Sequence, residues 1–425
     1  MRKNMRGVTS AILSISLLTV MAGAAMAPAL GTIKEHFSSC SPMTVQLIVS
    51  LPALFIILTT FAFRPLCRLM RTRTLALTGL TLYVLAGAGA FFVDDIALLL
   101  VLRALLGVSV GMVMPLSTGL LSFYFPPEEQ SRLMGFSAAM NQMGGVVATL
   151  LAGILASVEW RYAFLVYLAG LLAALLVAIF LPNERLNNEN DNENEKLNDN
   201  DNEKRGSSTL NSKLSTLNLL RKFHPSVTAM LFIMLLFFVY PTNFALTARE
   251  QGVPMLTTTL IMVGLDVVAF VVGLLFGWLM RNLRRQMKYA APLFFLGGYA
   301  VLAFVLGLEG MIIGSALIGL ANGAGVPYVN TIASIKGGKE AAVTVMPLIS
   351  AALYLGQFLS PLIVEPLSRT IQTFNYQLSI INSSNAPYLV AMCLAVLFLA
   401  QMYLTRRHQA LPPTSASSTP PKARR

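Results

Sequence analysis

The chain has 425 residues, of which 55% are hydrophobic and only 12% are charged, whereas an average soluble protein is roughly 25% charged. This composition excludes an ordinary soluble protein and predicts a bundle of membrane-spanning helices. The formal net charge of +12 does not indicate nucleic-acid binding, because the Lys and Arg residues gather in short connections beside long apolar runs.

Apolar runs divide the chain into twelve predicted transmembrane helices. The first run follows the basic stretch MRKNMR and could be read as a cleaved secretory signal. We favour a retained helix, because the apolar character continues beyond the small residues AMA and many more spans follow. The predicted limits are 8–31, 43–63, 74–93, 96–124, 132–156, 160–182, 226–248, 256–280, 288–307, 310–335, 341–364 and 387–405.

Basic residues mark alternate connections between these spans. The connection between spans two and three and the one between spans eight and nine are strongly basic, and both ends of the chain are basic too. The intervening connections, such as FVDD and LEG, carry few cations. The positive-inside rule therefore predicts a multi-pass protein of the plasma or inner membrane with both termini in the cytoplasm. The connection cations are Arg64, Arg68, Arg71 and Arg73, and Arg281, Arg284, Arg285 and Lys288.

One internal segment is neither apolar nor basic. Residues 183–205 are rich in Asn, Asp and Glu, and such a composition cannot bury enough apolar surface to offset the entropy of ordering. We predict a disordered cytoplasmic linker at 183–221 between an N-terminal half, 1–182, and a C-terminal half, 222–407. A disordered cytoplasmic tail is predicted to follow at 408–425.

The two halves repeat one another. A shift of 212 residues moves the glycines and proline of GVSVGMVMP in span four onto those of GLANGAGVP in span ten, and a shift of 213 moves Pro28 onto Pro241. Small residues at four-residue spacing favour close helix contacts in lipid; flexing during function is the alternative role. The repeated residues are Gly107, Gly111 and Pro115, and Gly319, Gly323 and Pro327.

Six spans in each half mean that both repeats enter the membrane from the same side. We therefore predict an all-α integral membrane protein of two parallel six-helix repeats, with a site at the midplane between them.

Span four carries the most specific family resemblance. Its sequence LVLRALLGVSVG places Arg103, Gly107 and Gly111 in the arginine and glycine positions of the span-four motif of the major facilitator superfamily of secondary transporters. The chain resembles that family over nearly its whole length, about 8–405. The resemblance implies alternating access, in which two halves rock around a central cavity, and it implies a role for Arg103 in proton or anion coupling.

Two other family motifs are degenerate here. The signature loop between spans two and three keeps Arg73, but Arg68 stands where the family has an acidic residue, and Arg281 takes that place in the second half. The family's proton-coupled drug exporters have Gly-Pro in span five, where this chain has Ala148 and Thr149. These departures weaken, without excluding, a drug-antiporter assignment.

Two charged residues inside spans are candidates for proton coupling, because charges are costly in a bilayer. Arg103 lies about one third along span four, and snorkelling to the outer headgroups is its alternative role. Asp266 lies near the middle of span eight with no Lys or Arg within a helical turn, and a site among apolar groups suits reversible protonation. Its alternative role is a hydrogen bond that only packs two helices. The equivalent residue in the first half is Ala53.

Neutral polar residues inside the spans form a second group of candidates. Amides and a phenol can bind polar groups of a solute without a fixed charge, and hydrogen bonding between helices is the alternative. Asn141 and Tyr354 are equivalent under the 213 shift. The candidates for the substrate cavity are Asn141, Gln142, Asn243, Asn322, Asn330, Tyr354 and Gln357.

No pattern for a cofactor, a metal centre or a catalytic triad is present in the sequence, and no Walker phosphate loop predicts ATP hydrolysis. We therefore predict a non-enzymatic, monomeric secondary transporter of a small organic solute, driven by protons and working as an efflux antiporter. Two alternatives stay open: proton-coupled solute uptake, and a membrane sensor that keeps the fold but transports nothing.

Overall fold

A computed structural model describes residues 2–184, 205–283, 286–340, 345–378 and 385–404. These residues form helices and no strands, and twelve of the helical segments are long and apolar enough to cross a membrane. The predicted all-α membrane fold of twelve spans is therefore confirmed.

The N-terminal half contains the first six spans. Side chains define two of the helix starts: Ser41 accepts a hydrogen bond from the Thr44 amide at 3.2 Å, and Asp95 accepts one from the Leu98 amide at 2.8 Å. The elements are α1 (Arg2–Ala24), α2 (Leu30–His36), α3 (Pro42–Phe61), α4 (Phe63–Leu69), α5 (Thr72–Ala88), η1 (Gly89–Phe92), α6 (Ile96–Tyr124), α7 (Pro127–Ala156), η2 (Trp160–Leu168) and α8 (Ala169–Phe180).

The C-terminal half contains the other six spans. Gly252 (φ 74°) and Gly307 (φ 90°) occupy the left-handed region, which only glycine adopts readily, at the connections that follow the first and third of these helices. The elements are α10 (Arg205–Glu250), α11 (Met255–Leu283), α12 (Met287–Phe304), α13 (Leu308–Glu340), α14 (Met346–Leu378) and α15 (Ala386–Leu404).

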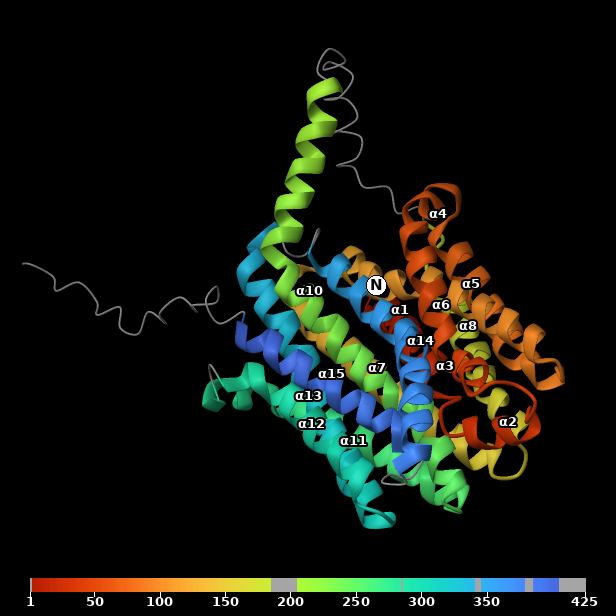
Figure 1. The fold of residues 1–425 in the computed structure, drawn as a ribbon. Helices are drawn as coiled ribbons and strands as arrows, with labels where there is room; N and C mark the ends of the chain where they lie inside the picture. The colour runs from red at the N-terminus through yellow and green to blue at the C-terminus, as the bar shows by residue number, and fades with distance from the viewer. Residues whose placement is uncertain (1, 185–204, 284–285, 341–344, 379–384, 405–425) are drawn as a thin grey trace, which may run out of the picture.

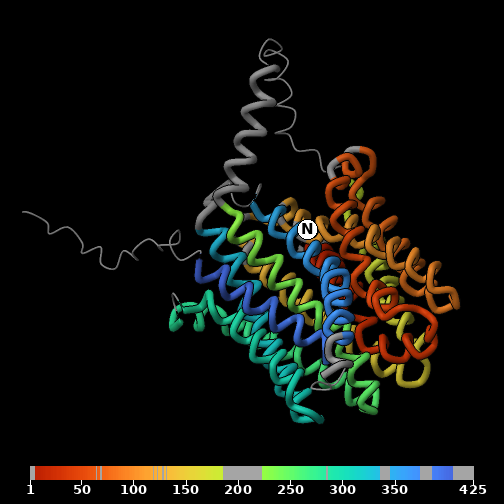
Figure 2. Tube along the Cα trace, in the orientation of Figure 1, coloured from red at the N-terminus to blue at the C-terminus, as the bar shows by residue number. Residues whose placement is uncertain are grey.

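The two halves lie side by side, and α14 and α10 of the second half face α3 of the first (Figure 1). The colour change along the Cα trace separates the halves clearly (Figure 2). We call the end of the bundle that carries α4 and the start of α10 the linker end, and the opposite end, which carries α2, the α2 end.

The repeated glycines make equivalent contacts in the two halves. A Cβ atom on Gly107 or Gly111 of α6 would come within 3.0 Å of the carbonyl oxygens of Pro52 and Ile56 in α3. A Cβ atom on Gly319 or Gly323 of α13 would do the same to Leu265 and Ala269 in α11, which a 213-residue shift relates to Pro52 and Ile56. Close backbone packing thus explains why glycine stands at these positions.

Two predicted limits differ from the structure. The first span, predicted at 8–31, ends at Ala24 and is followed by turns and by α2, because Pro28 has no amide hydrogen for the next helical bond. The seventh, predicted at 226–248, agrees with the apolar stretch Phe223–Glu250, although the helix α10 that contains it already begins at Arg205. The eleventh, predicted at 341–364, continues through Pro366 to Leu378, and there the Ser368 hydroxyl donates to the Val364 carbonyl at 2.7 Å.

The predicted linker at 183–221 falls mostly outside the described residues or within α10. Residues 185–204 and the predicted tail at 408–425 are outside the described ranges, whereas 205–221 form the first part of α10. Disorder at 185–204 and in the tail therefore stays a prediction.

Candidate functional site

An ion pair joins the two halves at the α2 end. Arg249 of α10 donates from Nε and Nη2 to the two carboxylate oxygens of Glu35 in α2, at 2.6 and 2.9 Å. Gly31, one turn earlier in α2, approaches the Ala245 carbonyl so closely that a Cβ atom would lie 2.8 Å from it. The short helix α2 is therefore docked on α10 by both charge and close packing.

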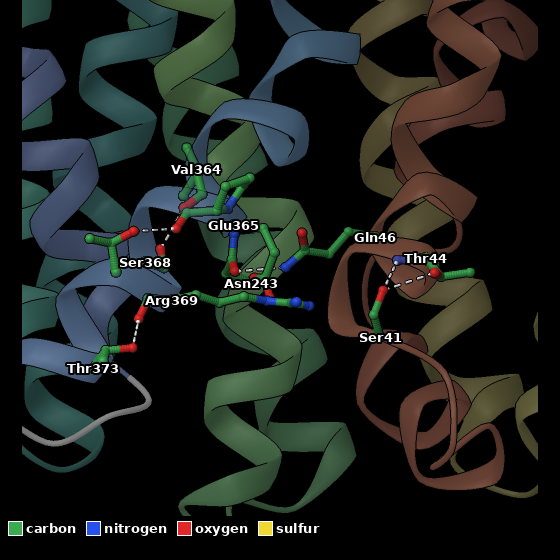
Figure 3. Close-up of polar contacts among 11 residues, drawn as sticks. Ser41, Thr44, Gln46, Asn243, Val364, Glu365, Ser368, Arg369 and Thr373 are labelled. Carbon is green, nitrogen blue, oxygen red and sulfur yellow. Dashed lines mark hydrogen bonds and ion pairs between the residues drawn. The ribbon is translucent and has the colours of Figure 1, made fainter. Parts of the chain in front are cut away.

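A second polar contact lies deeper between the halves (Figure 3). The Gln46 amide of α3 donates to the Asn243 side-chain oxygen of α10 at 2.9 Å, and both residues are buried. On α14, Arg369 donates to the buried Glu365 carboxylate at 3.0 Å. Its side chain extends toward the contact between Gln46 and Asn243 (Figure 3). Asn243 was a predicted cavity residue, and the structure places it at a contact that must break if the halves separate at this end.

A third contact involves the predicted coupling residue Asp266. The Thr149 hydroxyl of α7 donates to the Asp266 carboxylate of α11 at 3.2 Å. One turn further along α7, a Cβ atom on Gly153 would overlap the side chain of Thr259 in α11. Asp266 is half-buried and takes part in no ion pair recorded for the described residues. The carboxyl thus sits at the interface of the halves without a cationic partner.

The other coupling candidate, Arg103, lies inside the N-terminal half and does not meet Asp266. Its side chain is completely buried, so it does not snorkel to the surface. Nη1 donates to the Tyr167 hydroxyl at 2.9 Å and Nη2 to the Gly87 carbonyl at 3.4 Å. The guanidinium lies 5.0 Å from the ring centroid of Phe164 and 4.9 Å from that of Tyr167.

The remaining polar candidates do not form one cluster. Asn141 accepts from the Thr19 hydroxyl at 2.7 Å within the first half, and Gln357 points to the Met234 sulfur at 3.9 Å within the second. Tyr354 of α14 contacts the Met114 sulfur of α6 at 2.9 Å, across the halves. The other three are Gln142, which is exposed, and Asn322 and Asn330, which are half-buried.

The signature-loop arginine Arg73 has a partner in its own half. Its guanidinium donates to the Ala178 carbonyl in the last turn of α8, where a cation complements the negative end of the helix dipole. Among the described residues, no three His, Cys, Asp or Glu side chains come together as metal ligands would. The candidate site is therefore the set of contacts that joins the halves, and among its described carboxyls Asp266 is the one that takes part in no recorded ion pair.

Sequence reasoning missed most partners of these residues. Glu35, Gln46 and Arg249 were not singled out, because each lies near a span end and its partner is about 200 residues away in the chain. Thr149 was noted only as a departure from the exporter motif. That departure was a usable signal, since it puts a hydroxyl where the exporters have proline.

Comparison with known proteins identifies the family. The Major Facilitator Superfamily model matches residues 12–361, and the chain therefore belongs to that superfamily of membrane transporters. A curated relative, the "Probable anion transporter 4, chloroplastic" of Arabidopsis thaliana, is 41% identical over 59 residues, which is 14% of this chain and 11% of that protein. The chain thus matches about a tenth of that relative's length.

Solved transporters share the fold at low sequence identity. A bacterial homolog of the human lysosomal transporter Spinster, in an inward-facing and occupied conformation, aligns with a TM-score of 0.76 and 15% identity over 94% of this chain and 96% of that one. A D-xylose–proton symporter aligns with a TM-score of 0.67 and 14% identity over 94% of this chain and 97% of that one. Both likenesses concern the fold.

Proposed function

We propose that this transporter exports a small organic solute in exchange for protons, by alternating access. The observation that carries the proposal is the position of Asp266, a carboxyl at the contact between halves that bonds to a hydroxyl and not to a cation. Ionisation of a carboxyl changes the free energy of a desolvated contact by several kcal/mol in order of magnitude. Proton binding at Asp266 would therefore shift the balance between two arrangements of the halves.

The orientation of the protein is part of the proposal. The described cations at the start of α5 and at the end of α11, such as Arg71, Arg73 and Arg281, belong to the linker end, and the positive-inside rule would put that end in the cytoplasm. In a cell membrane with this orientation, the Glu35–Arg249 and Gln46–Asn243 contacts would close the outer side. Outward opening would break them together with the Thr149–Asp266 bond. Asn141, Tyr354 and the other cavity candidates stay predictions, as does the monomeric state.

Inside-out membrane vesicles test this function. Ethidium and tetraphenylphosphonium would serve as cationic probes and salicylate as an anionic one, with an entrapped pH-sensitive dye reporting proton release. A transported probe is expected to dissipate an imposed proton gradient in the parent protein. Asp266→Asn should abolish this response, whereas Asp95→Asn should preserve it, because Asp95 is an exposed helix cap.

Three outcomes separate the alternatives. Probe-driven proton movement that survives Asp266→Asn would show that Asp266 does not carry the proton. Probe uptake into right-side-out vesicles, driven by an inward proton gradient, would replace efflux by symport. A sensor without transport activity would move neither probe nor proton in any of these vesicles.

A further inference from the structure

The end of α1 carries a backbone carbonyl that its own helix does not satisfy. Pro28 cannot donate to the Ala24 carbonyl, which instead accepts from the Ala27 amide at 3.3 Å as the chain turns. The stretch from Gly23 to Gly31 contains no polar side chain. The Met21 carbonyl accepts from the Ala25 amide at 3.2 Å, whereas no backbone donor to the Ala22 carbonyl is recorded among the described residues, so a donor for that carbonyl comes from another helix.

Two tyrosines donate to α1, one to the Ala22 carbonyl in its last turn and one to the Leu18 carbonyl one turn earlier. The Tyr167 hydroxyl of η2 donates to the Ala22 carbonyl at 3.1 Å, and the Tyr83 hydroxyl of α5 donates to the Leu18 carbonyl at 3.2 Å. Their rings contact one another edge to face, with centroids 5.6 Å apart. Arg103 donates to the oxygen of Tyr167 at 2.9 Å, so a chain of hydrogen bonds runs from α6 through η2 to the end of α1.

The surroundings of Arg103 suit a permanent cation and contain no recorded carboxylate partner among the described residues. Two aromatic ring faces and the Gly87 carbonyl contact the guanidinium. The C-terminal end of α1, where the helix dipole is negative, lies one hydroxyl away. A Cβ atom at position 87 would lie within 3.0 Å of the Tyr167 side chain, so Gly87 allows this ring to approach.

We propose that Arg103 is a positioning residue, which fixes the end of α1 through Tyr167 and thereby sets where α2 lies. The turns at 25–29 connect α1 directly to α2, which carries the Glu35 contact to the second half. A free α1 end would let α2 shift relative to its dock. This role goes beyond proton coupling at Asp266 and would hold even if Asp266 carried no proton.

A tryptophan next to α2 provides a readout that needs no transported solute. The chain has two tryptophans. Trp160 is 8% exposed, and its ring lies 5.0 Å from that of His36 and 5.8 Å from that of Phe37, whereas Trp278 is 57% exposed. In a Trp278→Phe protein, acrylamide quenching of the remaining fluorescence reports whether α2 covers Trp160.

The variants remove the hydrogen-bond chain in steps. Arg103→Gln and Tyr167→Phe should each raise the acrylamide quenching constant of Trp160 severalfold. Arg103→Lys should give an intermediate value, because one ammonium cannot bond to Tyr167 and Gly87 in the fixed geometry of a guanidinium fork. Arg132→Gln is the matched control and should leave quenching unchanged, because Arg132 is exposed near the linker end, over the Phe136 ring.

Two results would overturn the proposal. One is unchanged Trp160 quenching in folded Arg103→Gln and Tyr167→Phe proteins. The other is loss of proton-driven transport in Arg103→Gln with normal quenching, which would make Arg103 a coupling residue. If Arg103→Gln fails to fold, Tyr167→Phe still decides the matter, since it removes one hydroxyl and keeps the ring.

Discussion

Spans one and seven carry equivalent prolines but respond to them differently. At Pro28 the helix stops, and the chain turns before continuing as α2, whereas α10 runs through Pro241 without interruption to Glu250. The two positions are related by the 213-residue shift that relates the two halves. Proline alone therefore does not decide whether a membrane helix breaks.

The difference lies in the neighbouring side chains. After Pro241, the Thr242 hydroxyl donates to the Phe238 carbonyl at 2.6 Å, and the Asn243 amide donates to the Val239 carbonyl at 2.9 Å. These bonds reinforce the helical turn next to the Phe237 carbonyl, which Pro241 cannot serve, and the helix continues past the proline. The first span has no such side chains near Pro28, and its helix ends at Ala24.

The residue equivalent to Arg103 in the second half is also different. A shift of 212 residues moves Arg103 onto Ser315, which bonds to the Tyr240 hydroxyl at 2.7 Å and donates to its own helix at Met311. Serine is too short to reach a neighbouring helix end. A tyrosine hydroxyl also bonds to α10, from Tyr299 to the Leu236 carbonyl, but there the helix is continuous. The first half thus has a supported helix break, and the second has a continuous helix.

The largest expected loss of stability follows from substituting the glycines that the two halves share. Gly107→Val and Gly319→Val should each destabilise the protein by about 3 kcal/mol, because the new side chain would overlap a backbone carbonyl of the facing helix. Apparent melting temperatures in detergent provide the measurement. Gly119→Val is the control, since nothing lies within 4 Å of its Cβ position. Loss of stability in only one half would contradict the equivalence of the helix contacts.

A smaller loss of stability is expected next to Pro241, where the helix of the second half continues and that of the first half ends. Asn243→Leu should cost about 1–3 kcal/mol, because it leaves the buried Gln46 amide without its partner and removes the side-chain donor to the Val239 carbonyl. Hydrogen exchange of the amides around Pro241 should then become faster, as at a forming hinge. Asn330→Leu is the control, since the structure records no partner for that half-buried amide. Unchanged exchange at Pro241 would show that local donors do not keep α10 continuous.

The smallest effect concerns the contact between α2 and α10. Glu35 and Arg249 are 53% and 45% exposed, and an exposed ion pair contributes about 0.2–1 kcal/mol. A double-mutant cycle with Glu35→Gln and Arg249→Gln should give a coupling energy in this range that falls with added salt. Arg281→Gln should show no coupling to Glu35. A coupling energy of zero would remove the ion pair from the α2-end contact.

Local sequence properties predicted much of this fold. The length of apolar runs predicted the twelve spans, and the repeated glycines and prolines predicted two equivalent halves. Partners across the halves could not be predicted in this way, because Gln46 and Asn243 are 197 residues apart and Glu35 and Arg249 are 214 apart. Their pairing depends on how two independently patterned bundles dock.

The helix break at Pro28 was not predicted, for a related reason. The sequence shows the same proline in both halves, and only the structure shows which carbonyls find donors. Arg103 was predicted as an intramembrane charge, but its partners on η2 and α5 are set by packing within the first half. Composition and residue spacing do not predict which side chains pack around Arg103.

We propose that protonation of Asp266 controls separation of the halves at the α2 end. Spin labels at Ser39 and Glu250, both exposed there on opposite halves, would measure it in lipid nanodiscs. The three native cysteines, Cys40, Cys67 and Cys393, would first be replaced by alanine. We predict that the distance distribution changes between acidic and alkaline buffer, and that Asp266→Asn gives one distribution in both. A pH-dependent change that persists in Asp266→Asn, or none in the parent protein, would contradict the claim.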